Sequence, residues 1–395
     1  MFKDVSVDNS LGDRKIKVGI VGLGLVANSH IEGYENNPKV ELLAVCDTDE
    51  ERAKNIARRH NIPLVFGSFI SMLESDIDAV SITTPTYLHT EMTMLALQYG
   101  KHVNCEKPFC INVDQGQKVI NEAKARSLVL AVDESYIFTS SFLKARKLIE
   151  QDLIGEPMQM RQRLGPMLRK STDQSEMVVP DNRDWRVDGD KSGGGDYPWL
   201  FDISVHFFAI AEYLMLGERI KEVFSVSSSE MPLNIKIKPT DDPYTLSSND
   251  IPLITWKYLS PYKQGVWMRS EPLNGKYDFM RGFSVSIFGS KGMLEILGEG
   301  GANLLHDGKQ VQMILYKNGF EPEPFTFEEN GDSRWQSEVN YYNQAHCNQI
   351  EDFIEAIISG REPVYGGRDG LRSVNVALAS IVSANNNIPV TLEYV

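Results

Sequence analysis

The stretch that decides the fold reads Ile16-Lys17-Val18-Gly19-Ile20-Val21-Gly22-Leu23-Gly24-Leu25-Val26-Ala27. Its first half is a short apolar run, which is typical of a buried strand. Gly22, Gly24 and Ala27 then complete a G-x-G-x-x-G/A pattern. Gly22 permits a tight turn, Gly24 has no side chain to keep a pyrophosphate off the backbone, and Ala27 lets the next helix lie close to the strand. The N–H groups at the start of that helix would bind phosphates.

An acidic residue follows the next predicted strand. Residues 40–46 are mostly apolar and end at Asp47, about 20 residues beyond the glycines, where dinucleotide-binding folds place a ribose-binding acid. A carboxylate there accepts a hydrogen bond from the ribose 2′-hydroxyl and repels a 2′-phosphate. We therefore expect NAD rather than NADP as the cofactor. The alternative is a glycine turn in some other type of α/β protein.

The composition limits the classes of function. A chain of 395 residues is long enough for about two domains. A formal net charge of −14 disfavours nucleic acid and anionic membranes as main partners. No apolar run is long enough to cross a bilayer, and residues 1–14 lack the apolar segment of a secretory signal, so we expect them to form a loose arm.

Cysteine and histidine spacings point to no metal or redox motif. The four cysteines form no C-x-x-C pair, and the seven histidines are scattered. We expect the cysteines to be reduced, which suits the cytoplasm, and we expect no metal site.

The order of elements predicts two domains. Strand-like and helix-like segments alternate over residues 15–138, which predicts a Rossmann-type α/β domain with a doubly wound parallel sheet. Residues 139–395 instead carry successive strand-like runs separated by turn signals, which predict an α+β domain with a mainly antiparallel open sheet and helices on one face. Residues 170–190 and 230–250 are polar and poorly patterned, and we expect long loops there.

Three pieces of sequence together carry a family resemblance. They are the glycine pattern at residues 22–27, the run Gly-Lys-His-Val-Asn-Cys-Glu-Lys-Pro at residues 100–108, and Asp202 placed four residues before His206. With weaker pieces at residues 287–292 and 352–363, the chain resembles the Gfo/Idh/MocA oxidoreductases from about residue 15 to its end. The resemblance implies an NAD(P)-dependent enzyme for sugars, inositols or related polyols. It also implies a dimer or tetramer formed through the open sheet face.

The resemblance and the chemistry of hydride transfer assign roles to three residues. Lys107 would hydrogen-bond the substrate oxygen and stabilise its alkoxide character, and His206 would exchange the proton of the substrate hydroxyl. Asp202 would orient the substrate or tune the histidine. Lysine as the final proton acceptor remains an alternative. So do a surface lysine at Lys107 and a satisfied core pair on the predicted helix.

Further contacts complete the expected site. The cofactor-binding residues are expected to be Gly22, Gly24, Leu25, Val26, Ala27, Asp47, Thr84, Pro85, His89, Glu106 and Lys107. The substrate-binding residues are expected to be Lys107, Tyr136, Trp185, Arg186, Asp202 and His206, with Trp199 and Trp335 as further aromatic candidates. Packing in a core or an interface is the alternative for each aromatic residue, and a helix-start histidine is the alternative for His89.

One spacing departs from the family pattern. Asp202 comes seven residues after Gly195 instead of the usual four, so Asp196 could be mistaken for the functional acid. We prefer Asp202 because only it keeps the four-residue distance to His206.

The sequence thus predicts an NAD-dependent oxidoreductase that transfers hydride between nicotinamide and a secondary hydroxyl or ketone of a sugar, glycoside or cyclic polyol. The alternatives are an enzyme that cleaves glycosides by transient oxidation with bound NAD, and a non-enzymatic NAD-binding regulator.

Overall fold

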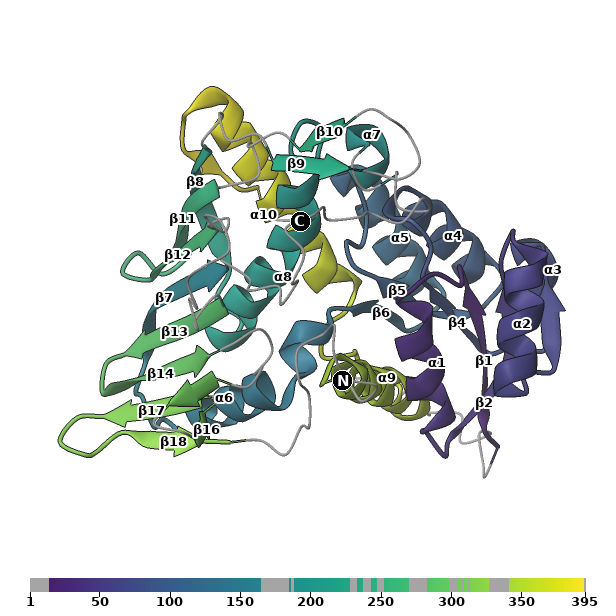
Figure 1. The fold of residues 1–395 in the computed structure, drawn as a ribbon, viewed down its shortest axis with the longest axis horizontal. Coiled ribbons are helices and arrows are strands. Elements are labelled where there is room, and N and C mark those ends of the chain that lie inside the picture. The colour runs from purple at the N-terminus through teal and green to yellow at the C-terminus, as the bar shows by residue number, and fades with distance from the viewer. Residues whose placement is uncertain are drawn as a thin grey trace, which may run out of the picture. The chain divides into compact units, whose positions relative to one another are not determined.

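The computed structural model describes residues 14–164, 185, 188–227, 233–236, 243–246, 252–269, 283–297, 304–306, 309–311, 313–326 and 341–393. The chain divides into two compact units, whose elements are labelled in Figure 1. The first unit comprises residues 1–134 and 346–371, and the second comprises residues 135–345 and 372–395.

The first unit is built on a parallel sheet of six strands in the order β3-β2-β1-β4-β5-β6. The strands are β1 (Ile16–Val21), β2 (Val40–Cys46), β3 (Leu64–Phe66), β4 (Ala79–Ile82), β5 (His102–Glu106) and β6 (Leu130–Asp133). Every neighbouring pair is parallel. This confirms the predicted doubly wound sheet, because the chain crosses over by a helix after each strand and reverses direction between β3 and β4.

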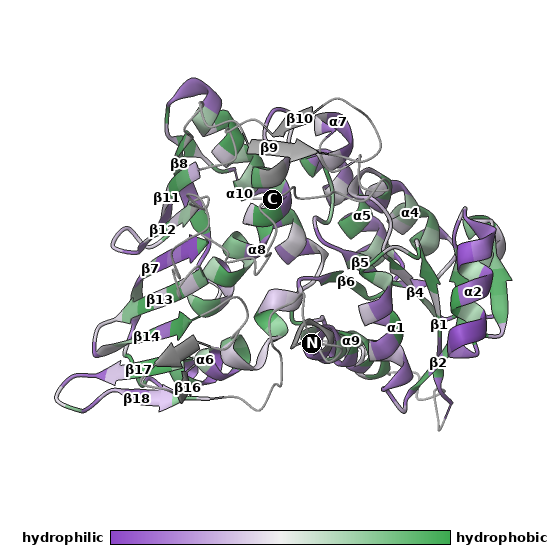
Figure 2. Ribbon diagram, viewed as in Figure 1, coloured by the Kyte–Doolittle hydropathy of each residue, from purple (hydrophilic) through white to green (hydrophobic). Residues whose placement is uncertain are grey.

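Helices connect these strands. They are α1 (Ala27–Glu35), α2 (Glu50–His60), α3 (Phe69–Leu73), α4 (Thr86–Gln98) and α5 (Val113–Ala125). The Asp49 side chain caps α2 by accepting a hydrogen bond from the Arg52 N–H at 3.0 Å. In Figure 2 the strands of this sheet are mostly hydrophobic, whereas α2 carries a hydrophilic surface. That pattern is typical of a sheet covered on both faces.

A late segment of the chain returns to the first unit. Helix α9 (Tyr341–Ser359) places Ile350 and Phe353 in the same buried cluster as Ile20 of β1. The approach is close, since a Cβ on Gly33 of α1 would lie 2.5 Å from Ile350 Cδ1. The division therefore differs from the predicted continuous second domain at 139–395. The pattern of one amphipathic helix does not say which core its apolar face joins.

The second unit contains a sheet of nine strands in the order β18-β17-β14-β13-β7-β12-β11-β8-β19. The strands are β7 (Pro157–Leu164), β8 (Ile220–Ser227), β11 (Pro252–Tyr258), β12 (Gln264–Arg269), β13 (Phe283–Gly289), β14 (Gly292–Leu297), β17 (Met313–Lys317), β18 (Glu323–Phe325) and β19 (Val390–Thr391). All pairs are antiparallel except β7 with β12. The predicted mainly antiparallel sheet is confirmed.

Helices cover one face of this sheet. They are α6 (Ser140–Glu150), α8 (Pro198–Leu214) and the part of α10 (Gly367–Asn386) beyond residue 371. Gln162 Nε2 of β7 donates to the Phe207 carbonyl of α8 at 2.7 Å, and the Ser225 N–H of β8 donates to Ser383 Oγ of α10 at 2.9 Å. The other face is open among the described residues, since residues of β11 alternate between buried and exposed.

The remaining strands form two small hairpins. They are β9 (Leu233–Lys236) with β10 (Pro243–Leu246), and β15 (Leu304–His306) with β16 (Lys309–Val311). The expectation of a loop throughout residues 230–250 was therefore wrong, because β9 and β10 pair within it. Short strands in a polar context give too weak a periodic signal to be recognised. Within the described part of the chain, no helix is both long and apolar enough to cross a membrane.

The two motif glycines differ in their surroundings. Gly22 has a φ of +87°, and a Cβ on it would lie 2.8 Å from the Thr84 backbone nitrogen, whereas a Cβ on Gly24 would meet no atom within 4 Å. We expect Gly22→Ala to lower the free energy of unfolding by about 2 kcal/mol through backbone strain and overpacking.

Gly24→Ala is the matched control and should change the free energy of unfolding by less than about 0.5 kcal/mol. Urea denaturation of both variants measures the difference. Equal stability of the two would contradict the packing described at Gly22.

Candidate functional site

The glycine turn is joined to the acid that follows β2. The Gly22 N–H donates to the Cys46 carbonyl at 2.9 Å, and the Leu23 N–H donates to Asp47 Oδ2 at 2.7 Å. The buried Asp47 carboxylate therefore holds the turn as well as standing at the predicted ribose position. Leu25 is exposed beside the open space at Gly24, and Val26 directly precedes α1. This arrangement leaves room for a ligand to approach the backbone of the turn at Gly24.

A basic residue stands beside the acid. Arg52 Nη1 lies 3.4 Å from Asp47 Oδ2, while Asp47 Oδ1 accepts from the Asp49 N–H at 2.8 Å. An arginine near this position accommodates a 2′-phosphate in some dinucleotide-binding folds. The site thus holds one group that favours NAD and, next to it, one that could pair with the additional phosphate of NADP.

The loop after β4 packs on the glycine turn. Thr83 Oγ1 donates to the Gly22 carbonyl at 2.6 Å. Thr84 and Pro85 are half-buried, and α4 begins directly after them. Because β1 and β4 are parallel neighbours, this loop and the turn lie at the same edge of the sheet.

His89 is occupied by two backbone carbonyls. Its Nδ1 lies 2.8 Å from the Pro108 oxygen, and its Nε2 lies 2.8 Å from the Thr84 oxygen. The ring is buried, and this burial lowers the pKa of His89. A neutral ring donates to one carbonyl only. The Nδ1–H tautomer therefore binds the loop after β5 through Pro108, and the Nε2–H tautomer binds the loop after β4 through Thr84.

Lys107 follows the last residue of β5, as predicted. Its backbone N–H donates to Glu106 Oε2 at 3.1 Å, and the Lys107–Pro108 peptide bond is cis. The side chain of Glu106 is buried, whereas Lys107 is partly exposed. The glutamate therefore fixes the backbone from which the lysine side chain projects.

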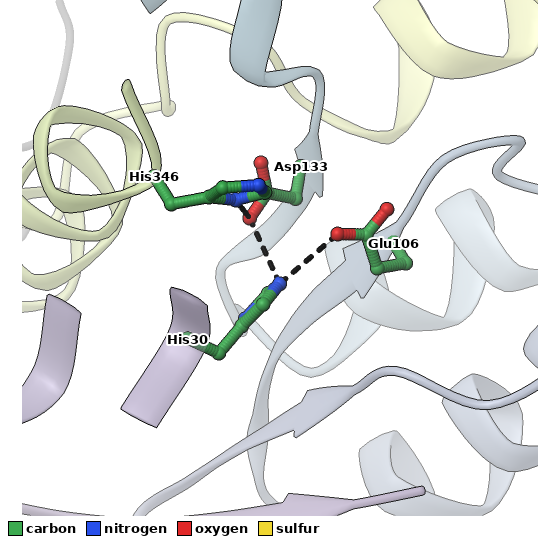
Figure 3. A group of neighbouring side chains, drawn as sticks. All are labelled: His30, Glu106, Asp133 and His346. Carbon is green, nitrogen blue, oxygen red and sulfur yellow. Dashed lines mark hydrogen bonds and ion pairs between the residues drawn. The ribbon is translucent and has the colours of Figure 1, made fainter. Parts of the chain in front are cut away.

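The structure also brings together four buried side chains whose grouping the sequence does not reveal. His30 Nε2 lies 3.1 Å from both Glu106 Oε1 and Asp133 Oδ2, and His346 Nδ1 lies 2.9 Å from Asp133 Oδ2 (Figure 3). Burial alone lowers the pKa of His30, but Asp133 and Glu106 outweigh it and raise that pKa to about 9. Burial would raise the pKa of Asp133, yet His346 and His30 hold it below its usual range.

The predicted acid–base pair lies on α8 in the second unit. Asp202 and His206 are one helical turn apart, and they are 7% and 4% exposed. The Tyr136 ring lies against His206, with ring centroids 4.1 Å apart and a tilt of 38°. Two predicted substrate-binding residues thus contact each other, and Asp202 lies on the same face of the helix.

The structure also distinguishes Asp202 from Asp196 by their positions relative to α8. Gly193 and Gly195 have φ values of +94° and +56°, so the chain turns before α8 begins at Pro198. Asp196 is exposed and precedes the helix, whereas Asp202 lies within it. The longer spacing is therefore accommodated by the turn.

Four candidates for substrate binding remain, namely three tryptophans and one arginine. Trp185 is half-buried. Arg186, Trp335 and the side chain of Trp199 lie outside the described residues.

Comparisons with known proteins cover nearly the whole chain. Residues 16–134 match the model of the Gfo/Idh/MocA oxidoreductase family described as an NAD-binding Rossmann fold, and residues 146–392 match its C-terminal alpha/beta domain. Myo-inositol 2-dehydrogenase of Thermotoga maritima is 22% identical over 96% of this chain and 99% of its own. Scyllo-inositol 2-dehydrogenase (NADP(+)) of Bacillus subtilis is 34% identical over 33% of this chain and 40% of its own.

Among solved structures, levoglucosan dehydrogenase in complex with NADH and L-sorbose has the same fold. It covers 97% of this chain and 100% of its own, with 20% identity and a TM-score of 0.77. Since the two family models match residues 16–134 and 146–392, the chain belongs to the Gfo/Idh/MocA oxidoreductase family.

Proposed function

We propose that this protein is an NAD-dependent oxidoreductase that interconverts a secondary hydroxyl and a ketone of a sugar, glycoside or cyclic polyol. The observation that carries the proposal is the buried Asp202–His206 pair on α8, in a chain of this family in which Lys107 directly follows strand β5. The relatives named for inositols and levoglucosan support the substrate class.

Each residue has a chemical task in the oxidation direction. When bound, NAD would supply the nicotinamide that accepts the hydride of the carbinol carbon. His206 takes the hydroxyl proton, so that the products are the ketone, the reduced nicotinamide and a protonated imidazole. The Lys107 ammonium stabilises negative charge on the substrate oxygen. Asp202 orients the substrate or the imidazole, and Tyr136 supports the ring of His206 by direct contact. Lysine as the final proton acceptor is the alternative.

The cofactor tasks fall on the first unit. Gly22, Gly24 and the N-terminus of α1 would bind the pyrophosphate, and Asp47 would accept a hydrogen bond from the ribose. Thr84 and Pro85 lie at the same edge, and His89 positions their loop through the Thr84 carbonyl. The NAD-binding family model over residues 16–134 supports this assignment.

The test of the activity is turnover. The purified enzyme is given a panel of monosaccharides, glycosides and inositols with NAD or NADP, and reduction is followed by nicotinamide absorbance. Net formation of NADH with at least one polyol or sugar supports the proposal. Sugar release without net NADH would instead indicate glycoside cleavage, and no turnover on any substrate would favour a non-enzymatic NAD-binding protein.

With a substrate in hand, His206→Gln should lower kcat by about 10²–10⁴ because the hydroxyl proton loses its acceptor. The pH dependence of kcat in the range where imidazole titrates should disappear as well. The control is His60→Gln, which removes a partly exposed histidine paired with Glu35 on the surface. Unchanged hydride transfer in His206→Gln, with the pH profile retained, would assign proton transfer to Lys107 instead.

Asp47→Asn tests the choice of cofactor. The amide keeps an oxygen that can accept from the Leu23 N–H but removes the charge that repels a 2′-phosphate, while Arg52 remains nearby. We expect the ratio of kcat/KM for NADP to that for NAD to rise at least about tenfold, which corresponds to roughly 1.4 kcal/mol. Asp49→Asn is the control, since asparagine caps a helix as well as aspartate does. An unchanged ratio in Asp47→Asn would remove the carboxylate from cofactor selection.

We also propose that the open face of the second sheet joins copies of this chain. Val226, Leu253 and Met268 are exposed and lie side by side on β8, β11 and β12. An exposed apolar row of this kind is typical of an interface. We expect the protein to be a dimer or tetramer by light scattering, and Leu253→Asp to shift it toward the monomer. A wild-type monomer at micromolar concentration would contradict the proposal.

The cysteines suit a reducing compartment such as the cytoplasm, where we propose the enzyme works. All four are free. Burial raises the pKa of the Cys110 thiol to about 12, so this thiol stays protonated and unreactive. Cell fractionation tests the placement.

A further inference from the structure

The four buried side chains His30, Glu106, Asp133 and His346 are here called the His–carboxylate cluster. Glu106 is among the predicted cofactor-binding residues, whereas the other three have no role in the proposed hydride transfer. The four residues come from α1, β5, β6 and α9, all within the first unit. Each offers one nitrogen or oxygen atom, and these four atoms lie within 4.8 Å of one another. In Figure 3, dashed lines join His30 to Glu106 and to Asp133, and His346 lies beside Asp133.

Two residues of this cluster have their outward atoms held by other groups. His30 Nδ1 lies 3.2 Å from Ser81 Oγ, which in turn lies 2.6 Å from Tyr34 Oη. Glu106 Oε2 accepts from the Lys107 N–H. Metal-binding histidines and carboxylates are oriented by partners of this kind on the atom that faces away from the metal. The inward atoms, His30 Nε2 and Glu106 Oε1, are thereby aimed at the middle of the cluster.

The charges of the cluster match a divalent cation. Glu106 and Asp133 are both buried, and among the described residues their ion pairs are with imidazole rings alone. Metal-binding imidazoles are neutral, so with both rings deprotonated the two carboxylates give the cluster a charge of −2, which one divalent ion neutralises. Two protons would do the same but would place two cationic rings with centroids 5.3 Å apart.

One atom of the cluster lacks a hydrogen bond. Asp133 is 1% exposed, and its Oδ1 has no hydrogen-bond partner among the described residues. A buried carboxylate oxygen without a partner is costly. Coordination of Asp133 to a metal ion would offset this cost, because buried charges are stabilised by pairing or by binding a metal.

We propose that the His–carboxylate cluster is a binding site for one divalent transition-metal ion, best matched by zinc. Two imidazoles and two carboxylates form a donor set that zinc accepts, whereas calcium and magnesium prefer oxygen donors alone. Tetrahedral zinc would require the ligand atoms to be roughly 3.4 Å apart, so the pairs now at 2.9 and 3.1 Å would open by a few tenths of an ångström.

The ion has a structural task. Four protein ligands fill a tetrahedral zinc site, and closed sites of this type are structural rather than catalytic. The metal would connect α9 to α1 and to the ends of β5 and β6. It would also fix Glu106, and through it the backbone of Lys107. The proposal does not depend on the substrate or on the reaction.

Metal content is the direct test. Untagged full-length protein is incubated with one equivalent of zinc, with magnesium in parallel, then dialysed and analysed by inductively coupled plasma mass spectrometry. We expect about one zinc and no magnesium per chain. His346→Gln and Asp133→Asn should lose the zinc, whereas His60→Gln, which alters a surface histidine of the same unit, should retain it.

Thermal unfolding and cobalt absorption give readouts that do not depend on activity. Zinc at a hundredfold excess over Kd should raise the Tm of the wild type by roughly 5 °C or more but leave His346→Gln unchanged. Cobalt should give the intense visible absorption of a tetrahedral site in the wild type and in His60→Gln only.

Two results would overturn the proposal. One is wild-type protein that neither retains zinc nor gains Tm from it. The other is zinc retained equally by the wild type and by folded His346→Gln and Asp133→Asn, which would place the metal elsewhere on the chain.

Discussion

Parallel pairing of the first sheet is the constraint on which the rest of the site depends. Six parallel strands end at one edge, so the residues that follow them gather there irrespective of their distance in sequence. Gly22 follows β1, Asp47 follows β2, the Thr84 loop follows β4 and Lys107 follows β5. Hydrogen bonds from the turn to Cys46 and Asp47, and from Thr83 to Gly22, then join these loops to one another.

Glu106 joins this edge to the interior of the unit. One carboxylate oxygen accepts from the Lys107 backbone, and the other faces His30. His30 and His346 then meet Asp133 at the end of β6. The position of Lys107 is in this way connected to a buried charged group. With a metal ion in that group, the fold of α9 and the geometry of the β5 edge would depend on the same ligands.

Much of the fold and part of the site followed from local sequence. The apolar runs, the glycine pattern and the position of Asp47 identify the Rossmann sheet, because a strand, a tight turn and a helix each have a short-range signature. Asp202 and His206 were identifiable because their four-residue spacing resembles the family pattern, and the structure places both on one buried helix. Elements with weak or ambiguous periodicity were missed, as the hairpin of β9 and β10 shows.

The sequence by itself determined which residues can do chemistry at the strand ends, since a helix or strand fixes the direction of its own side chains. Only the tertiary structure decided the partners of those residues. It placed His89 between two carbonyls, tied Asp47 to the glycine turn, and returned α9 to the first unit so that His346 reaches Asp133 across 213 residues of chain. The physical reason is that such contacts depend on how separate elements pack against each other. The periodicity of one segment does not indicate which other segment it will contact.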